Sequence, residues 1–211
     1  KPSFALRRRR QSSMWLAVDA AAQGRADTVV SAGNTGALLA ISMVAMRMLE
    51  GAHRPALASF LPTSRGETVM LDLGANLECD AENLAEFAVM GSVFAQVLLG
   101  LSEPTVGLLN VGSEELKGHE ELRQAAMLLR REGSPVSFHG FVEGNDIGAG
   151  KVDVVVTDGF TGNVALKTIE GTAKLYTSFV RDAFRTSTFA KIGYLFASGA
   201  WVKLSKRVDP R

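Results

Sequence analysis

Four short segments of this sequence place glycine and polar side chains directly after an apolar run, a pattern suited to holding an anion. They read Gly33-Asn34-Thr35-Gly36, Gly74-Ala75-Asn76, Gly112-Ser113-Glu114-Glu115 and Gly159-Phe160-Thr161-Gly162-Asn163. Glycine lets the backbone approach a ligand closely, and the free N–H groups at the start of a following helix attract anions. The pattern predicts a site for phosphate or another oxyanion. The alternative for any single segment is a glycine-rich turn that only reverses the chain.

Several other chemistries lack their motifs. None of the four segments fits G-x-x-x-x-G-K-[ST] or a complete G-x-G-x-x-G, which disfavours a Walker ATPase and an ordinary Rossmann dehydrogenase. No G-x-S-x-G elbow is present. His53, His119 and His139 share no ligand spacing, so we expect neither a metal nor a cofactor. The single cysteine, Cys79, excludes an internal disulfide framework and suits a reducing cytoplasm.

The segments must be positioned by alternating strands and helices. We expect an α/β domain with a mostly parallel, three-layer sheet, because short β-like runs alternate with longer helical patterns. In such a sheet the ligand crevice lies at the carboxyl ends of the strands. The predicted strands are 28–31, 56–61, 68–73, 106–111, 136–142 and 153–157, and the predicted helices are 13–23, 35–49, 81–99, 120–131 and 162–185.

Composition limits the class of protein. The 211 residues suffice for one large or two small domains, and 46% hydrophobic with 21% charged residues excludes intrinsic disorder. The net charge of +1 excludes a global nucleic-acid-binding surface. The uncharged run 28–46 is long enough to cross a bilayer, but its polar first half leads us to expect no transmembrane segment. The two ends lead us to expect an internal segment of a longer protein, without a signal peptide.

The longer motifs of the chain resemble those of one known family. SAGNTGAL, LDLGAN, FAVMGS, VGLLNVGSEELKG and DVVVTDGFTGNVALKTIEG are similar, in order and spacing, to the bacterial phosphate acyltransferase family PlsX of phospholipid synthesis. The resemblance runs from ALRRRRQSSM through KLSKRVDP. It implies that long-chain acyl-acyl-carrier protein and inorganic phosphate give acyl phosphate and free carrier protein. It also implies a fold similar to phosphate acetyltransferases and to isocitrate and isopropylmalate dehydrogenases. The family's VDAMGGD-like N-terminal strand and its C-terminal third, with a Gly-rich and HGSS-like region, are missing here.

This resemblance gives the polar residues expected roles. Phosphate itself attacks the thioester, so no serine or cysteine nucleophile is required. Asn76 can donate to phosphate or to the thioester carbonyl. Lys117 is the main candidate for charge stabilisation or acid–base chemistry, with a solvated surface lysine as the alternative. The other catalytic candidates are Asp158 and Lys167, and the phosphate-binding candidates are Gly33, Asn34, Thr35, Gly36, Thr161, Gly162 and Asn163.

A run of four arginines precedes the first predicted helix. Arginine gives bidentate contacts to phosphate groups and carboxylates, so the run could recognise an acidic acyl carrier protein. The alternative is a solvated basic arm, and nucleic acid is disfavoured because no aromatic residues are interleaved. The candidate carrier-binding residues are Arg7, Arg8, Arg9 and Arg10.

The segment 189–208 has apolar residues at helical spacing between basic ones, with Gly193 and Gly199 expected to break it. That mixture suits a helix lying in an anionic membrane surface, and a dimer or core-packing helix is the alternative. The resemblance favours a protruding helical pair at a dimer interface that docks to the membrane. We therefore divide the chain into an α/β catalytic domain, 1–186, and a helical protrusion, 187–208. The candidate membrane residues are Phe189, Ile192, Phe196, Trp201 and Leu204.

Three functions follow as hypotheses. The first is the long-chain phosphate acyltransferase, a cytoplasmic, peripherally membrane-associated homodimer whose partners are acyl carrier protein, inorganic phosphate and the downstream glycerol-3-phosphate acyltransferase, and not nucleic acid. The second is a short-chain phosphate acyltransferase that uses coenzyme A. The third is a non-catalytic, membrane-associated scaffold that binds acyl carrier protein.

Overall fold

The structure, a computed structural model, describes residues 12–197, 199–200 and 202. Its internal contacts divide the chain into two compact units, Lys1–Pro55 and Ala56–Arg211. The boundary predicted between residues 186 and 187 lies within the second unit and stays a prediction. We describe each unit by itself.

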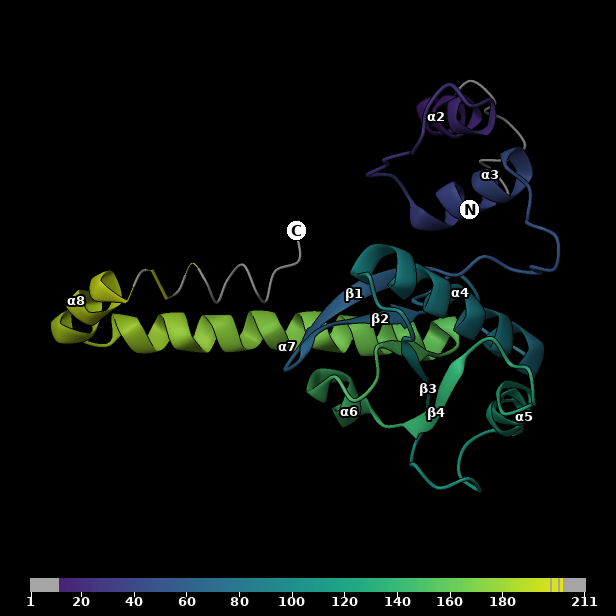
Figure 1. The fold of residues 1–211 in the computed structure, drawn as a ribbon. Helices are drawn as coiled ribbons and strands as arrows, with labels where there is room; N and C mark the ends of the chain where they lie inside the picture. Colours follow the sequence, from purple (N-terminus) through teal and green to yellow (C-terminus); the bar gives the residue numbers. More distant parts are fainter. Residues whose placement is uncertain (1–11, 198, 201, 203–211) are drawn as a thin grey trace. The chain divides into compact units, whose positions relative to one another are not determined.

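The first unit contains two helices, α2 (Ser13–Ala22) and α3 (Thr35–Ala45) (Figure 1). The hydroxyl of Ser12 accepts a hydrogen bond from the first turn of α2, as a serine N-cap does. Val18 of α2 and Ile41 of α3 are the buried hydrophobic residues of the described part of this unit. Both helices were expected from the sequence.

Two expectations for this unit are wrong. The buried strand predicted at 28–31 does not form, and the side chain of Val30 is 91% exposed. A strand needs a neighbouring backbone with which to pair, and the described part of this unit offers none. Helix α3 ends at Ala45 rather than near residue 49, because Arg47 adopts a left-handed φ of 64° that a continuing helix cannot accommodate.

The second unit is built on a five-stranded sheet in the order β1-β2-β5-β3-β4. Strands β2, β5, β3 and β4 are parallel, and β1 joins the edge antiparallel to β2 through a tight hairpin. The strands are β1 (Ala58–Thr63), β2 (Gly66–Leu71), β3 (Thr105–Leu109), β4 (Ser137–Val142) and β5 (Val154–Val156).

Helices cover both faces of this sheet. One core cluster joins α4 and α5 to the sheet, and a second joins α6 and α7 to its other face. The expected α/β architecture with a mostly parallel sheet is therefore confirmed. The helices are α4 (Ala81–Leu99), α5 (Glu120–Leu129), α6 (Gly144–Ala149), α7 (Gly159–Arg185) and α8 (Thr188–Phe196).

Helix α4 is long and apolar enough to cross a membrane by length and composition, and within the described residues it alone meets that test. Its inner side chains, among them Leu84 and Phe87, are buried against the sheet, as in the core helix of a domain. Gly91 lets the helix approach the sheet closely, since a Cβ there would lie 2.6 Å from a methyl of Val154. Gly100, with φ of 68°, ends the helix as expected.

Two helices depart from the sequence prediction. Helix α6 was not expected, and its one and a half turns are held by a capping box between Glu143 and Asp146. Helix α8 runs through Gly193 and ends at Phe196, so the break predicted at Gly193 is wrong. Glycine weakens a helix by only about 1 kcal/mol, which the neighbouring turns can offset.

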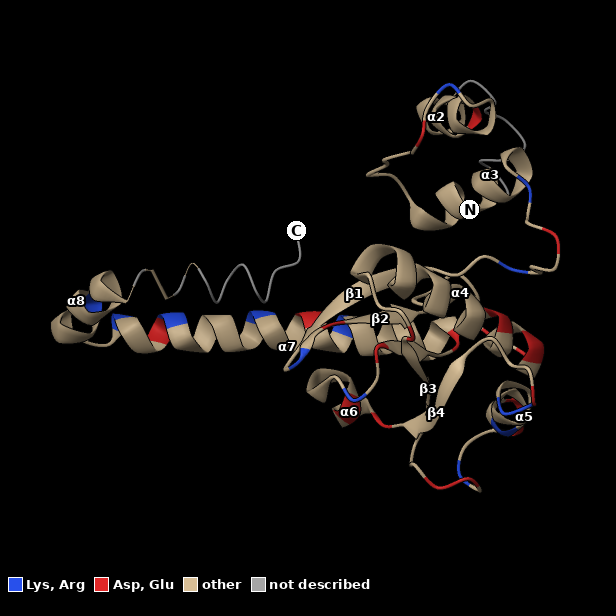
Figure 2. Cartoon of the chain, viewed as in Figure 1, with Lys and Arg blue, Asp and Glu red and all other residues tan. Residues whose placement is uncertain are grey.

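Helix α7 continues well beyond the sheet, and α8 turns back along its far end (Figure 1). The rings of Phe184 on α7 and Tyr194 on α8 contact each other with centroids 5.5 Å apart. Charged residues recur along the outer half of α7 (Figure 2). Ile169 is the last residue of α7 that packs against the core of the sheet. We call residues 170–196, which follow it, the α7–α8 arm.

Candidate functional site

Three of the four glycine-rich segments lie where the parallel strands of the sheet reach their carboxyl ends, which we call the carboxyl edge of the sheet. The segments containing Asn76, Asp158 and Lys117 follow β2, β5 and β3, which are adjacent parallel strands. Parallel strands end at the same edge, and two strand spacings separate β2 from β3 by about 10 Å. The geometry therefore brings these three loops together. The fourth segment, 33–36, belongs to the first unit.

The loop after β2 is organised around the fully buried carboxylate of Asp72. Its Oδ1 accepts the backbone N–H groups of Leu57, Gly74 and Ala75 at 2.9–3.1 Å. Its Oδ2 accepts the backbone N–H of Asn76 at 2.7 Å and the side-chain amide of the same residue at 2.9 Å. The predicted site residue Asn76 is thus held in place through its backbone and its side chain.

The same loop packs tightly on the start of α7. Gly159 donates its backbone N–H to the carbonyl oxygen of Asn76 at 2.7 Å. A Cβ at Gly159 would lie 2.5 Å from that oxygen, and a Cβ at Gly162 would overlap with the carbonyl oxygen of Asp72. Glycine is required at both positions because backbone occupies the space that a side chain would need.

Asp158 and Thr161 form the N-terminal cap of α7. Asp158 Oδ1 accepts the backbone N–H of Thr161 at 2.8 Å, and its Oδ2 accepts the Thr161 hydroxyl at 2.7 Å. These contacts account for both side chains structurally, and any catalytic role for them stays a prediction. One and two turns further on, Asn163 and Lys167 are exposed, and Lys167 Nζ lies 3.0 Å from Glu170 Oε2.

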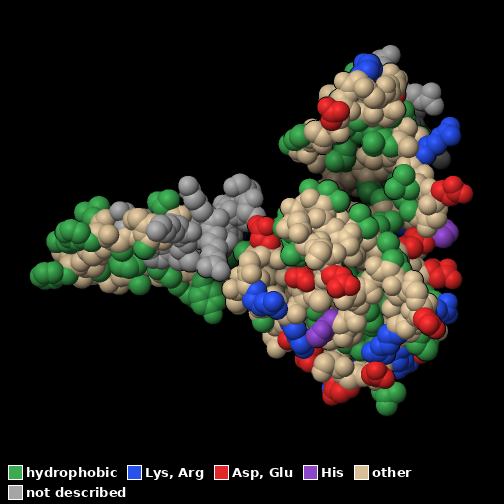
Figure 3. All heavy atoms as spheres, viewed as in Figure 1, with side chains coloured by type: hydrophobic (Ala, Val, Ile, Leu, Met, Phe, Trp, Pro, Cys, Tyr) green, Lys and Arg blue, Asp and Glu red, His purple; other side chains and the backbone are tan. Residues whose placement is uncertain are grey.

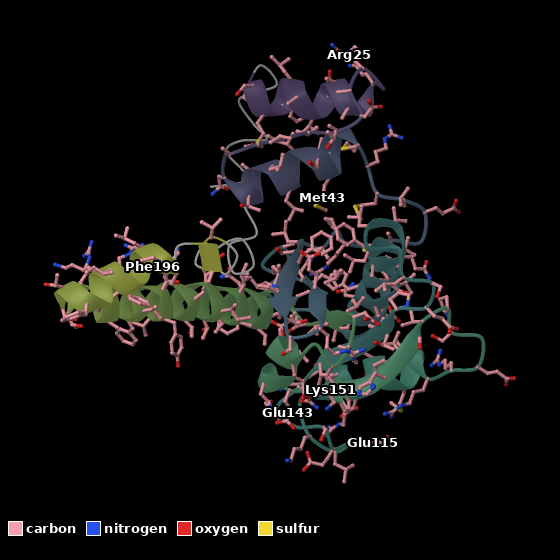
Figure 4. The ribbon with its side chains drawn as sticks, turned by 60° about the vertical axis from the view of Figure 1, so that its left-hand side comes forward. Arg25, Met43, Glu115, Glu143, Lys151 and Phe196 are labelled. Atoms are coloured by element: carbon pink, nitrogen blue, oxygen red, sulfur yellow. The ribbon has the colours of Figure 1, made fainter. Side chains whose placement is uncertain are left out.

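The loop after β3 carries Lys117, whose side chain is 51% exposed and whose Nζ lies 2.7 Å from Glu114 Oε1. The hydrogen bond with Glu114 raises the pKa of Lys117 above its ordinary value, and Glu143 after β4 adds a weaker attraction. Figure 4 shows Glu143 and Glu115 on these loops. An ammonium at this position can stabilise negative charge, and both charge stabilisation and acid–base chemistry by Lys117 stay predictions. The same contact lowers the pKa of Glu114.

In the first unit, Asn34 is the N-cap of α3. Its Oδ1 accepts the backbone N–H of Ala37 at 3.0 Å, and Thr35 is the first helical residue. The segment is thus a loop leading into a helix N-terminus, as the sequence predicted, although the expected strand before it is missing. Phosphate binding by Gly33, Asn34, Thr35 and Gly36 stays a prediction.

The predicted surface residues are partly outside the description. Arg7, Arg8, Arg9, Arg10, Trp201 and Leu204 lie outside the described residues. Of the predicted membrane residues, Phe189 and Phe196 are 87% and 89% exposed on α8, and Ile192 is 47% exposed. Figure 4 shows Phe196 on α8, and Figure 3 shows hydrophobic side chains along the α7–α8 arm.

Two buried polar residues of this edge were missed from the sequence. Asp72 was included in a strand, and Asn110 was taken as part of the following strand 106–111. Both are less than a tenth exposed, and each follows its strand directly. A single polar side chain at the end of an apolar run, two residues before glycine, is the signal that marks both of them. Among the described residues, no three His, Cys, Asp or Glu side chains cluster as a metal site would require.

Comparison with known families decides the relationship. A family model described as "Fatty acid synthesis protein" matches residues 1–211. The chain belongs to this family. Its membership confirms the resemblance stated from the motifs, because relatives in the family are phosphate acyltransferases by name. One, from Rhodospirillum centenum, is 65% identical over 211 residues, which are 100% of this chain and 59% of that protein. Another, from Paramagnetospirillum magneticum, is 60% identical over 100% of this chain and 60% of its own length.

The chain thus spans about three fifths of the length of these relatives of the family. Among solved structures, the phosphotransacetylase EutD from Staphylococcus aureus superposes with a TM-score of 0.60 at 19% identity. That match covers 82% of this chain and 62% of the other. At this identity the likeness concerns the fold, and it agrees with the α/β architecture expected from the sequence.

Proposed function

We propose that this family member, at the full length of its relatives, is a phosphate acyltransferase that makes acyl phosphate from an acyl thioester and inorganic phosphate. The observation that carries the proposal is the meeting of the Asn76, Lys117 and α7 loops at one edge of a parallel sheet. The names of the relatives support the same activity.

The reaction is an attack by a phosphate oxygen on the thioester carbonyl carbon. A C–O bond forms, the C–S bond breaks, and the carrier leaves as a thiolate that takes up a proton from water. Because a thiol has an ordinary pKa of about 8.5, its departure needs no strong general acid. What the reaction needs is compensation of negative charge on phosphate and on the tetrahedral oxyanion. We assign this compensation to the Lys117 ammonium and the Asn76 amide, and their loops after the neighbouring parallel strands of the sheet support the assignment.

We further propose acyl carrier protein as the thioester donor, with the basic run 7–10 as its contact. We also propose that the protein is cytoplasmic and docks on an anionic membrane. The docking is supported by two phenylalanines of α8 that are almost fully exposed beside Lys191. Homodimer formation and delivery of the product to the downstream glycerol-3-phosphate acyltransferase complete the proposal.

The test compares long-chain acyl-acyl-carrier protein, acetyl-coenzyme A and butyryl-coenzyme A as donors in the presence of phosphate. We expect acyl phosphate, trapped as its hydroxamate, from the carrier-bound donor at the highest kcat/KM. Preference for acetyl- or butyryl-coenzyme A would support the short-chain enzyme instead. Binding of the carrier without any acyl phosphate would support the scaffold.

A further inference from the structure

Asp72 stands out among the polar residues of the sheet edge because it is completely buried and accepts five hydrogen bonds. One donor, the backbone N–H of Leu57, precedes edge strand β1. The other four belong to the loop that contains Asn76. The carboxylate therefore connects the start of edge strand β1 to the loop that contains Asn76, a proposed substrate contact.

The two carboxylate oxygens divide this work. Oδ1 accepts three backbone N–H groups, whereas Oδ2 accepts the backbone N–H and the side-chain amide of Asn76. An ionised carboxylate can only accept hydrogen bonds, so the nitrogen of the Asn76 amide must face Asp72. Because the amide group is planar, this contact sets the plane of the whole Asn76 side-chain amide.

We propose that Asp72 is a positioning residue for the acyl transfer, acting through Asn76. It sets the plane of the Asn76 amide so that the amide meets phosphate or the thioester carbonyl in a fixed orientation. This inference rests on the proposed function.

The packing around the loop extends the effect to α7. The carbonyl oxygen of Asn76 accepts the backbone N–H of Gly159, the first residue of α7. The backbone of Asp72 itself continues the ladder with β5, since its N–H donates to the carbonyl of Thr157 at 3.0 Å. Asp72 therefore holds the loop after β2 in register with the helix N-terminus that follows β5.

The substitution Asp72→Asn separates the two functions of the carboxylate. The new side chain can keep an oxygen toward Leu57, Gly74 and Ala75, and its NH2 group then faces the N–H groups of Asn76 and repels them. The shape of the side chain is unchanged, so the orientation of Asn76 is the feature altered. Asp153→Asn is the matched control. Asp153 similarly accepts the N–H and the hydroxyl of Thr105, but it lies at the amino ends of the strands, away from the loops of the proposed site.

The experiment is a double-mutant cycle of Asp72→Asn and Asn76→Ala in the protein at the full length of its relatives, measured as KM for phosphate and kcat. We expect each single variant to worsen the same parameter by about tenfold or more, and the double variant to match Asn76→Ala within about twofold. Asp153→Asn should lower the melting temperature and leave both parameters near wild type. The inference is overturned if the two effects multiply, or if Asp72→Asn lowers only the melting temperature.

A second measurement does not depend on turnover or on a stable variant. In the wild-type protein, the side-chain amide protons of Asn76 should exchange with solvent more slowly than those of an exposed asparagine, because one is bonded to a buried carboxylate. Exchange at the rate of an exposed asparagine would overturn the inference. Absence of acyl phosphate from the wild-type protein, with this protection intact, would instead contradict the proposed function alone.

Discussion

The side-chain amide of Asn110 donates a hydrogen bond to the main-chain carbonyl of Lys117 at 3.0 Å and so closes the loop that follows β3. The other end of the same amide accepts the backbone N–H of Val111 at 2.8 Å. Asn110 is 8% exposed, so its side of both contacts is buried. A buried amide thus fixes the backbone from which the exposed Lys117 side chain extends.

Replacing Gly118 should disturb this loop. Gly118 has a φ of 87°, and a Cβ there would overlap with the side-chain oxygen of Asn110. We expect Gly118→Ala to lower stability by more than the ~1–2 kcal/mol of left-handed strain and to reduce acyl transfer. Gly133→Ala is the matched control, because Gly133 has a φ of 82° with nothing within 4 Å of its Cβ position. Equal melting temperatures and activities for the two variants would show that the contact with Asn110 is unimportant.

Removing the ammonium of Lys117 should act on the chemical step. We expect Lys117→Ala to lower kcat by about 10²-fold or more with little change in melting temperature, because an exposed ion pair stabilises the fold weakly. Arg131→Ala is the control. It removes an exposed positive charge that precedes the amino end of β4, away from the carboxyl ends of the strands, and it should leave kcat unchanged. Wild-type turnover in Lys117→Ala would return this residue to the class of surface lysines.

Asn34, the N-cap of α3, and Asn163, in the second turn of α7, should affect the KM for phosphate more than the KM for the acyl donor. We expect Asn34→Ala and Asn163→Ala to raise KM for phosphate more than KM for the thioester. Asn34→Ala also removes the cap of α3, at a cost of about 1 kcal/mol. Ser12→Ala removes the equivalent cap of α2 and controls for that loss. Steady-state kinetics with an unchanged phosphate dependence in both asparagine variants would count against their role.

Asp146 should contribute to the loss of folding stability at acidic pH, which we call the acid limb of the stability curve. The backbone N–H of Glu143, and then Lys151, lower the pKa of Asp146 below its ordinary value. A carboxyl with a lowered folded-state pKa stabilises the fold above its unfolded-state pKa of about 3.9, and this contribution disappears as the pH falls through the lower folded-state value. Asp146→Asn should therefore cost about 1 kcal/mol near neutrality and show a shallower loss of stability in acid.

Urea unfolding at several pH values measures the acid limb. Asp182→Asn, which changes an exposed carboxylate on α7, serves as the control and should keep the wild-type acid limb. An Asp146→Asn curve parallel to that of wild type down to low pH would contradict the assignment.

The α7–α8 arm should bind anionic vesicles. Phe196 is 89% exposed, and burying it in the headgroup boundary contributes on the order of 2 kcal/mol, which Phe196→Asp would remove while adding a charge. We expect this variant to lose co-sedimentation with vesicles and to keep acyl transfer in solution. Val97→Asp, on an exposed position of α4, should sediment like wild type. Sedimentation of Phe196→Asp with the vesicles would indicate a packing surface.

Local patterns made most of the fold predictable. Apolar runs such as 153–157 locate β5, and Asp80 and Gly100 delimit α4 closely because capping is a short-range effect. Residues 28–31 have the same apolar, β-branched character, yet they form no strand. Pairing depends on a neighbouring backbone that the local sequence does not specify. Helix α6 was missed because its two glycines disfavour a helix, whereas its capping box stabilises one.

The loops of the candidate site were predictable from the sequence, but the buried residues that hold these loops by hydrogen bonds were not. The order of the strands, β2-β5-β3, brings the loops of Asn76 and Lys117 to one edge, and strand order is a property of the whole sheet. Asp72 and Asn110 contribute through hydrogen bonds to backbone groups of their loops, and such contacts depend on the folded turn. The spacing of residue types therefore found the exposed candidates and missed the buried residues that hold them.

The most direct test of the central claim is mass spectrometry of the product formed from long-chain acyl-acyl-carrier protein and phosphate labelled with ¹⁸O at every oxygen. Because phosphate is the nucleophile, the acyl phosphate should retain all the labelled oxygens of phosphate, including the one bonded to the acyl carbon. The wild-type protein at the full length of its relatives should form this species, and Lys117→Ala should form much less. Unlabelled fatty acid as the sole acyl product would show attack by water and contradict the account.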